Sequence, residues 1–250
     1  MSVLTLRLAG PLQAWGASAR FVRRTTESAP TKSGVIGMLA AAQGLQRGDD
    51  AGLAPLSALR FGVRIDQPGT RVRDFQTAHH AVTGKSMPLS ERFYLADAVF
   101  VAALEGDNTL ITALHTALRA PVYPPYLGRR SCPPALPVEL GLHPDITLDQ
   151  ALRDEPWQAS AWYQKCHGSQ TTVPLVTLRE ATGGERDGEE DVLRDQPLSF
   201  AAEHRRHALR TVVSTTLNVP NPRAQAARTP APGHTVPHHD PLSALEEETA

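Results

Sequence analysis

The chain has 250 residues, of which 41% are hydrophobic and 20% are charged, a composition typical of a protein that buries a core in one large domain or in one domain with a smaller companion. No segment approaches the roughly 18–20 consecutive apolar residues that span a bilayer, and the first residues, MSVLTLRLAG, lack the apolar run of a signal peptide, so we expect a cytoplasmic location. The net charge of −1 does not decide about nucleic acid, because arginines gather in residues 1–130 while acids gather in 185–195 and 246–248.

Alternating and β-branched runs predict strands, and apolar residues at helical spacing predict helices. The expected core elements are strand, helix, strand, strand, helix and strand, at residues 3–8, 31–48, 60–65, 98–104, 107–118 and 137–142. This order predicts an α+β fold with a ferredoxin-like (RRM-like) βαββαβ core in residues 1–143. Two extended stretches between the second and third strands predict an inserted β-hairpin at about residues 71–94.

Beyond the core the apolar pattern weakens. Residues 144–217 are expected to form a small β-rich appendage, whereas residues 218–250 are rich in Pro, Ala, His and Glu without an apolar period and are expected to be a disordered tail. The two cysteines, Cys132 and Cys166, lie far apart without a CxxC partner, so the spacing favours neither a zinc site nor a disulfide framework.

The first stretch that suggests a function follows the first strand, which Gly10 and Pro11 end. Trp15 then lies between small residues, and two interpretations of it are open: a core side chain below the sheet, or a platform for stacking or for a neighbouring subunit. The expected helix begins at Thr31, Lys32, Ser33 and Gly34, where free N–H groups and the helix dipole suit a phosphate. Capping residues begin most helices, so this signal is weak, and no P-loop motif is present.

The inserted hairpin carries a second candidate surface. Alternation places Arg71, Arg73, Phe75 and Thr77 on one face, where arginines and an aromatic suit contact with an RNA backbone and its bases. The alternative is a solvated edge strand whose charges prevent aggregation. The adjacent histidines at 79–80 point to opposite faces of a strand and cannot readily chelate one ion, so we expect neither a metal site nor a cofactor.

The sharpest stretch is YPPYLGRRSCPP at residues 123–134. Prolines stiffen both ends, Gly128 permits a conformation open to close ligand approach, and Arg129 and Arg130 offer forked donors for phosphate. These properties favour an anion-binding loop over a structural turn.

Four stretches in this order, LRLAGPLQAWG (6–16), PTKSGVIGMLAAAQGLQR (30–47), RDFQTAHH (73–80) and PYLGRRSCPP (125–134), resemble the CasD-type subunits of type I-E Cascade, members of the repeat-associated mysterious protein (RAMP) superfamily. The resemblance is close over residues 1–140 and looser over 145–215. It implies a ferredoxin-like domain with a hairpin thumb and a glycine-rich loop, here 126–130. It also implies a non-catalytic subunit that grips the single-stranded 5′ handle of the CRISPR RNA and caps the backbone filament in antiviral defence.

The implied partners are the CRISPR RNA, the backbone filament subunit and the large target-recognition subunit, with target DNA contacted indirectly. Motifs and resemblance together predict RNA-binding residues in four segments: Gln13, Trp15, Arg20, Arg23, Thr31, Lys32, Ser33, Gly34, Arg71, Arg73, Phe75, Thr77, Tyr126, Leu127, Gly128, Arg129 and Arg130. Which of the two adjacent arginines contacts phosphate stays open.

Two other functions compete with this interpretation. A metal-independent endoribonuclease that cuts repeat RNA needs a general base and an acid, and His79, His80, Lys32 and Tyr126 are candidates. The matching family leaves cutting to another subunit, which argues against this. A scaffold that contacts only proteins is a third possibility, against which the arginines of the glycine-rich loop argue.

Overall fold

The computed structural model describes residues 1–16, 23–181 and 188–224. The strands are β1 (Ser2–Ala9), β2 (Leu12–Gln13), β3 (Arg23–Arg24), β4 (Arg60–Gln67), β5 (Thr70–Gln76), β6 (Ser90–Ala96), β7 (Val99–Gly106), β8 (Glu139–Pro144), β9 (Thr172–Glu180), β10 (Glu189–Ser199) and β11 (Arg206–Pro220). The helices are α1 (Lys32–Gln43), α2 (Asp50–Ser57), α3 (Asn108–Arg119), α4 (Leu148–Asp154) and α5 (Ala161–Cys166). In the part of the chain that is described, no helix is long and apolar enough to cross a membrane.

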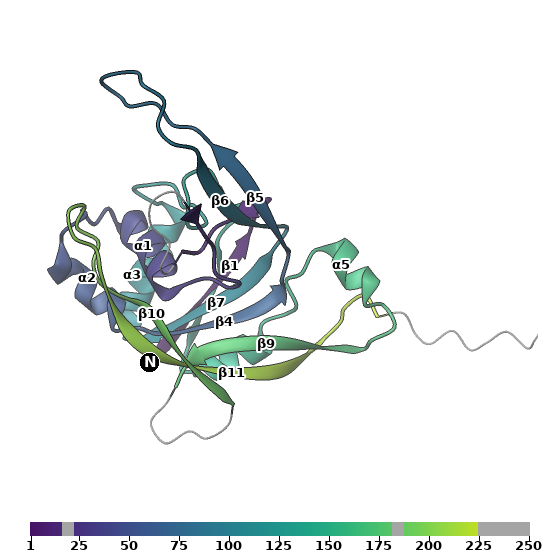
Figure 1. Cartoon of the computed structure of the whole chain (residues 1–250). Helices are drawn as coiled ribbons and strands as arrows, with labels where there is room; N and C mark the ends of the chain where they lie inside the picture. Colours follow the sequence, from purple (N-terminus) through teal and green to yellow (C-terminus); the bar gives the residue numbers. More distant parts are fainter. Residues whose placement is uncertain (17–22, 182–187, 225–250) are drawn as a thin grey trace, which may run out of the picture.

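A seven-stranded sheet in the order β10-β11-β9-β4-β7-β1-β8 forms the body of the protein, and its neighbouring strands are antiparallel. Separate helices pack on this antiparallel sheet (Figure 1). The predicted α+β class is therefore confirmed. The predicted βαββαβ strands correspond to β1, β4, β7 and β8, which lie side by side in the order β4-β7-β1-β8.

Both faces of the sheet are covered, which explains why β1 is almost entirely buried. Leu4, Leu6 and Leu8 point to one face and pack with α1 and α3 in the main core. Val3 points to the other face, where it packs with Leu152 of α4. The sheet is thus a central layer between helices, and a polar substitution on either side of β1 would bury an unpaired group.

Helix α1 ends earlier than its sequence pattern predicts. We expected it to continue to residue 48, but Gly44 takes a left-handed conformation (φ 80°) and ends it after Gln43. The Gly44 N–H donates to Ala41 O at 3.0 Å and the Leu45 N–H donates to Ala40 O at 2.9 Å, which satisfies the last carbonyl groups. The helical spacing beyond Gly44 belongs instead to the turn that leads to α2.

The predicted hairpin is present as β5 and β6, which pair from Thr70↔Ala96 to Gln76↔Ser90. It projects away from the main sheet (Figure 1). Strand β6 also pairs over two residues each with two short strands: antiparallel with β2 at the base of the hairpin, and parallel with β3 at the end of β6 nearer the hairpin tip. The hairpin is therefore joined to the body by little regular pairing.

The C-terminal segment extends the same sheet. Residues 144–217 contain α4, α5, β9, β10 and most of β11, and β9 joins them to the core because Gly62 to Arg64 of β4 pair with Thr177 to Arg179. The first residues of the predicted tail also belong to the fold. Val219 is 1% exposed, and the Asn221 amide donates to the carbonyl oxygens of Gln164 and His167 at 3.2 and 2.9 Å. The prediction of disorder from residue 218 is thus wrong for 218–224, and 225–250 lie outside the described residues.

Candidate nucleic-acid interface

The glycine-rich loop 126–130 is folded tightly against the segment that follows β1. Ala14 N–H donates to Leu127 O at 3.1 Å, and Leu127 N–H donates to Cys132 O at 2.7 Å. Leu127 itself is fully buried in the main core. Gly128 has φ 80°, and a Cβ at this position would overlap the Ala14 carbonyl oxygen. Only glycine fits, so the motif requires it for a close approach within the protein.

The two arginines of this loop have different environments. The Arg129 Nη2 donates to the Arg24 carbonyl oxygen at 2.9 Å, and its guanidinium carbon lies 4.7 Å from the centre of the Tyr94 ring in β6. Arg130 is exposed and forms no hydrogen bond or ion pair with any residue that the structure describes. The loop therefore presents Arg130 to solvent and uses Arg129 internally.

One face of the hairpin carries alternating arginines and aromatic rings. The Arg73 guanidinium lies 4.9 Å from the Phe75 ring centre, and Phe75 is 49% exposed. The Arg23 guanidinium from β3 lies 5.3 Å from the Phe93 ring centre and 3.8 Å from the Glu91 carboxylate. The pairs Arg73↔Phe93, Phe75↔Glu91 and Arg23↔Glu91 are in register, so all five side chains share this face. We call it the arginine–aromatic face. Thr77, just beyond β5, is exposed as well.

Arg71 lies on the same face nearer the base, where its Nη2 donates to the Thr26 carbonyl oxygen at 3.2 Å. Tyr94 pairs with Val72 and therefore points to the opposite face. The glycine-rich loop thus contacts, through Arg129, the hairpin face that is not the arginine–aromatic face. The sequence pattern placed the hairpin residues on one face but did not show that the loop supports the other.

The start of α1 does not offer the free phosphate site that its sequence suggests. Thr31 caps the helix by accepting from Gly34 N–H at 3.3 Å, and the buried Asp195 carboxylate accepts from Lys32 N–H at 2.7 Å. Lys32 is 2% exposed, and its ammonium lies 2.8 Å from the Glu180 carboxylate. Burial lowers the pKa of Lys32, and the neighbouring Glu180 opposes this by raising it.

Thr31, Lys32 and Ser33 are all buried, and the protein's own groups occupy the Thr31 hydroxyl, the Lys32 N–H and the Lys32 ammonium. The interpretation of this helix start as an RNA site is corrected accordingly. The sequence pattern does predict an anion at this helix start, and the structure has one there. That anion is the carboxylate of Asp195, 163 residues further along the chain.

The structure favours the core interpretation of Trp15. Its side chain is fully buried, its Nε1 donates to Gln13 Oε1 at 3.0 Å, and its ring packs closely against Gly34. Gln13 is also fully buried and donates to the carbonyl oxygens of Leu8 and Ala98 at 3.0 and 2.7 Å. Both side chains therefore support the loop at the sheet end and are shielded from a ligand.

Two further predicted features lie at the margins of this surface. Arg20 lies outside the described residues. His79 Nδ1 lies 3.1 Å from Gly84 O, and His80 Nδ1 accepts from the N–H groups of Val82 and Thr83 at 3.3 and 3.2 Å, so both rings shape the hairpin tip. Within residues 1–16, 23–181 and 188–224, no three His, Cys, Asp or Glu side chains gather as metal ligands.

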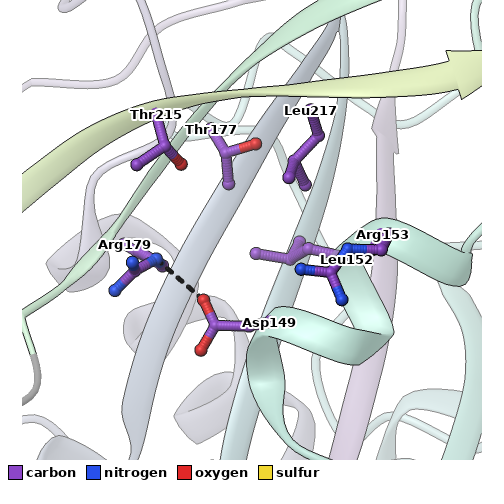
Figure 2. Close-up of a pocket in the computed structure, with 7 residues that line it drawn as sticks. All are labelled: Asp149, Leu152, Arg153, Thr177, Arg179, Thr215 and Leu217. Atoms are coloured by element: carbon purple, nitrogen blue, oxygen red, sulfur yellow. Dashed lines mark ion pairs between the residues drawn. The ribbon is translucent and has the colours of Figure 1, made fainter. Parts of the chain in front are cut away.

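A cavity of about 170 Å³ lies between α4 and the strands β9 and β11, on the face of the sheet that Val3 also faces. Figure 2 shows Arg179 and Arg153 on either side of Asp149. The Asp149 carboxylate is paired with Arg179 at 2.7 Å and with Arg60 at 3.0 Å. None of the predicted RNA-binding residues that the structure describes lines this cavity, which is a gap beside an ion-pair network.

Comparisons with known proteins agree with this architecture. Residues 3–213 match the family model of the CRISPR-associated protein Cas_Cas5. The CRISPR system Cascade subunit CasD of Escherichia coli (strain K12) is 39% identical over 158 residues, which are 56% of this chain and 70% of that protein.

Two solved structures are similar in fold and sequence. A structure titled "Crystal structure of Cas protein" has a TM-score of 0.65 at 36% identity and covers 89% of this chain and 97% of its own. A chain of a "CRISPR RNA-guided surveillance complex" has a TM-score of 0.68 at 32% identity and covers 90% of this chain and 93% of its own. Because the family model matches most of this chain, the chain belongs to the Cas5 family of CRISPR-associated proteins and is of the CasD type.

Proposed function

We propose that this protein is a non-catalytic CRISPR RNA-binding subunit of the type I-E Cascade complex, which grips the single-stranded 5′ handle and caps the backbone filament. The observation that carries the proposal is the arginine–aromatic face of a projecting hairpin, together with a glycine-rich loop that supports the other face of the hairpin and presents Arg130 to solvent. The proposed partners are the filament subunit and the large target-recognition subunit. We further propose that β1, β4, β7 and β8 with α1 and α3 are a ferredoxin-like core and that the hairpin is its thumb.

Single-stranded RNA suits this surface for a physical reason. Its unstacked bases stack on exposed aromatic rings, and its phosphates accept hydrogen bonds from guanidinium groups. Phe75 is half exposed, Arg73 lies against its ring, and Arg23 lies against the Phe93 ring with its Nε 3.8 Å from the Glu91 carboxylate. The residues proposed to contact RNA are therefore Arg23, Arg73, Phe75, Thr77 and Arg130. Gly128 and Arg71 are proposed to hold the protein backbone in place, through their contacts with Ala14 and Thr26.

Replacing Arg130 with alanine is expected to weaken binding of the RNA handle and to reduce the salt dependence of affinity by about 0.7 slope units, the loss of one phosphate contact to a single strand. Phe75→Ala is expected to cost about 1–3 kcal/mol of binding without changing that slope, because stacking releases no counterions. Mobility shifts of labelled repeat RNA across salt concentrations measure both effects, with the full chain alone and with its partner subunits.

Arg206→Ala is the matched control, since Arg206 is an exposed arginine paired with Asp50 at 3.1 Å and lies on β11. Equal slopes for Arg130→Ala, Arg206→Ala and the unchanged protein would refute the phosphate contact. The same reactions, run in EDTA, test the nuclease alternative. If the RNA is cut at a discrete site and a His79/His80 double variant no longer cuts it, the function is RNA cleavage and the proposed non-catalytic role is wrong.

A further inference from the structure

Arg129 connects three segments that are distant in the sequence. It belongs to the glycine-rich loop, donates to the Arg24 carbonyl of β3 at 2.9 Å, and places its guanidinium 4.7 Å from the Tyr94 ring of β6. Tyr94 is only 6% exposed and Arg129 is half-buried, so the contact is partly desolvated, which strengthens the attraction between cation and ring. The Nη1 atom of Arg129 is buried and has no hydrogen-bond partner among the described residues. This guanidinium is therefore turned into the protein.

Besides this contact, the hairpin is attached by short pairings, by Leu95 in the main core and by Arg71, which donates to the Thr26 carbonyl oxygen. A two-stranded hairpin is marginally stable by itself in water. At the base of the hairpin β6 pairs with β2 only through Leu12↔Ala96 and Gln13↔Leu95. Nearer the tip it pairs with β3 only through Arg23↔Glu91 and Arg24↔Arg92. Strand β5 is exposed along its whole length. Arg129 is the side chain through which the rigid, glycine-held loop meets both β3 and β6.

We propose that Arg129 is a positioning residue that fixes the orientation of the hairpin relative to the glycine-rich loop, and that Arg130 alone of the two makes the phosphate contact. The hydrogen bonds of Leu127 and the close packing of Gly128 against Ala14 hold the loop backbone in place. The Arg129 side chain therefore extends from a backbone position that is well defined. It holds the hairpin from the face opposite the arginine–aromatic face, so that face stays open in a defined orientation. Only the RNA part of this inference rests on the proposed function.

Hydrogen exchange of the free, full-length protein tests the positioning role without RNA. In Arg129→Met, backbone amides of residues 70–76 and 90–96 are expected to exchange about three- to tenfold faster, while amides of β1 and β7 keep their protection and show that the core is folded. Arg130→Met is the matched control and leaves the hairpin unchanged. Arg129→Lys keeps the positive charge near the ring and is expected to restore part of the protection.

A double-mutant cycle identifies the ring as the partner. Tyr94→Phe keeps an aromatic face and is expected to leave hairpin exchange unchanged, whereas Tyr94→Leu removes it and reproduces the effect of Arg129→Met. Adding Tyr94→Leu to Arg129→Met is expected to accelerate exchange no further, because the contact is already lost. Fully additive effects, or hairpin protection unchanged in Arg129→Met, would overturn the positioning role.

The RNA measurement separates this inference from the proposed function. Arg129→Met is expected to lower the affinity for labelled repeat RNA with the salt slope unchanged, whereas Arg130→Met lowers both. If Arg129→Met reduces the slope by as much as Arg130→Met, Arg129 contacts phosphate and the division of roles is wrong, although RNA binding stands. If the unchanged protein shows no salt-sensitive RNA binding with its partner subunits present, the proposed function fails, and the exchange result still decides the positioning role.

Discussion

Replacing Asp66 with alanine is expected to lower the free energy of unfolding by about 3–5 kcal/mol, because it leaves the buried Arg64 guanidinium without its counterion. Both side chains are fully buried, and the Arg64 Nε and Nη2 donate to the two Asp66 oxygens at 2.7 and 2.9 Å. Burial raises the pKa of Asp66, and the hydrogen bonds and charge of Arg64 oppose this by lowering it. The pair therefore depends on both partners.

This ion pair also holds the segment between α4 and α5, residues 155–160, against the sheet. Arg64 donates to the carbonyl oxygens of Leu152, Glu155 and Pro156 at 2.6, 2.7 and 2.9 Å. Gln158 N–H donates to the Asp66 carboxylate at 2.6 Å. Loss of the carboxylate is therefore expected to loosen this connection as well as the centre of the sheet.

Urea unfolding followed by circular dichroism measures the effect of Asp66→Ala. Asp50→Ala is the control, since the Asp50–Arg206 pair is about half exposed and should contribute less than about 1 kcal/mol. A chain carrying Arg64→Met and Asp66→Leu together is expected to regain part of the loss, because it removes both charges and fills the space. If Asp66→Ala and Asp50→Ala cost the same, the buried pair does not stabilise the fold.

Replacing Asp195 with alanine is the second large effect, again about 3–5 kcal/mol of unfolding free energy. The fully buried Asp195 carboxylate pairs with the Arg210 guanidinium at 2.6 Å and accepts from Lys32 N–H at 2.7 Å. Its removal leaves Arg210, whose side chain is 9% exposed, without its nearest carboxylate, and it leaves the Lys32 N–H in the first turn of α1 without its acceptor.

Thermal unfolding and exchange of the α1 amides measure this effect. Asp195→Asn keeps an acceptor for Lys32 N–H but loses the charge, so an intermediate loss of stability is expected. Asp191→Ala serves as the control because Asp191 is an exposed acid of the same strand. Equal stability of the Asp191 and Asp195 variants would refute the proposed role of Asp195 in holding the start of α1.

The sequence determined those features that depend on neighbouring residues. The strands of the sheet follow from local alternation, as in Leu4, Leu6 and Leu8, and the hairpin follows from two extended stretches around a turn. The family followed from short motifs such as PYLGRRSCPP, in which Gly128 is required by a positive φ and by contact with the Ala14 carbonyl. These features are readable because each depends on a few residues close together in the chain.

Only the tertiary structure decided how the predicted contacts are shared between ligand and protein. The helix start at Thr31 has the sequence of an anion site, but Asp195 occupies it from a distant strand. Arg129 and Arg130 are adjacent and identical in kind, yet only one meets Tyr94. The physical reason is the same for both. Whether a side chain is buried and paired depends on tertiary contacts between residues far apart in the sequence. Here those contacts form where β9, β10 and β11 extend the sheet and where the loop packs against the hairpin.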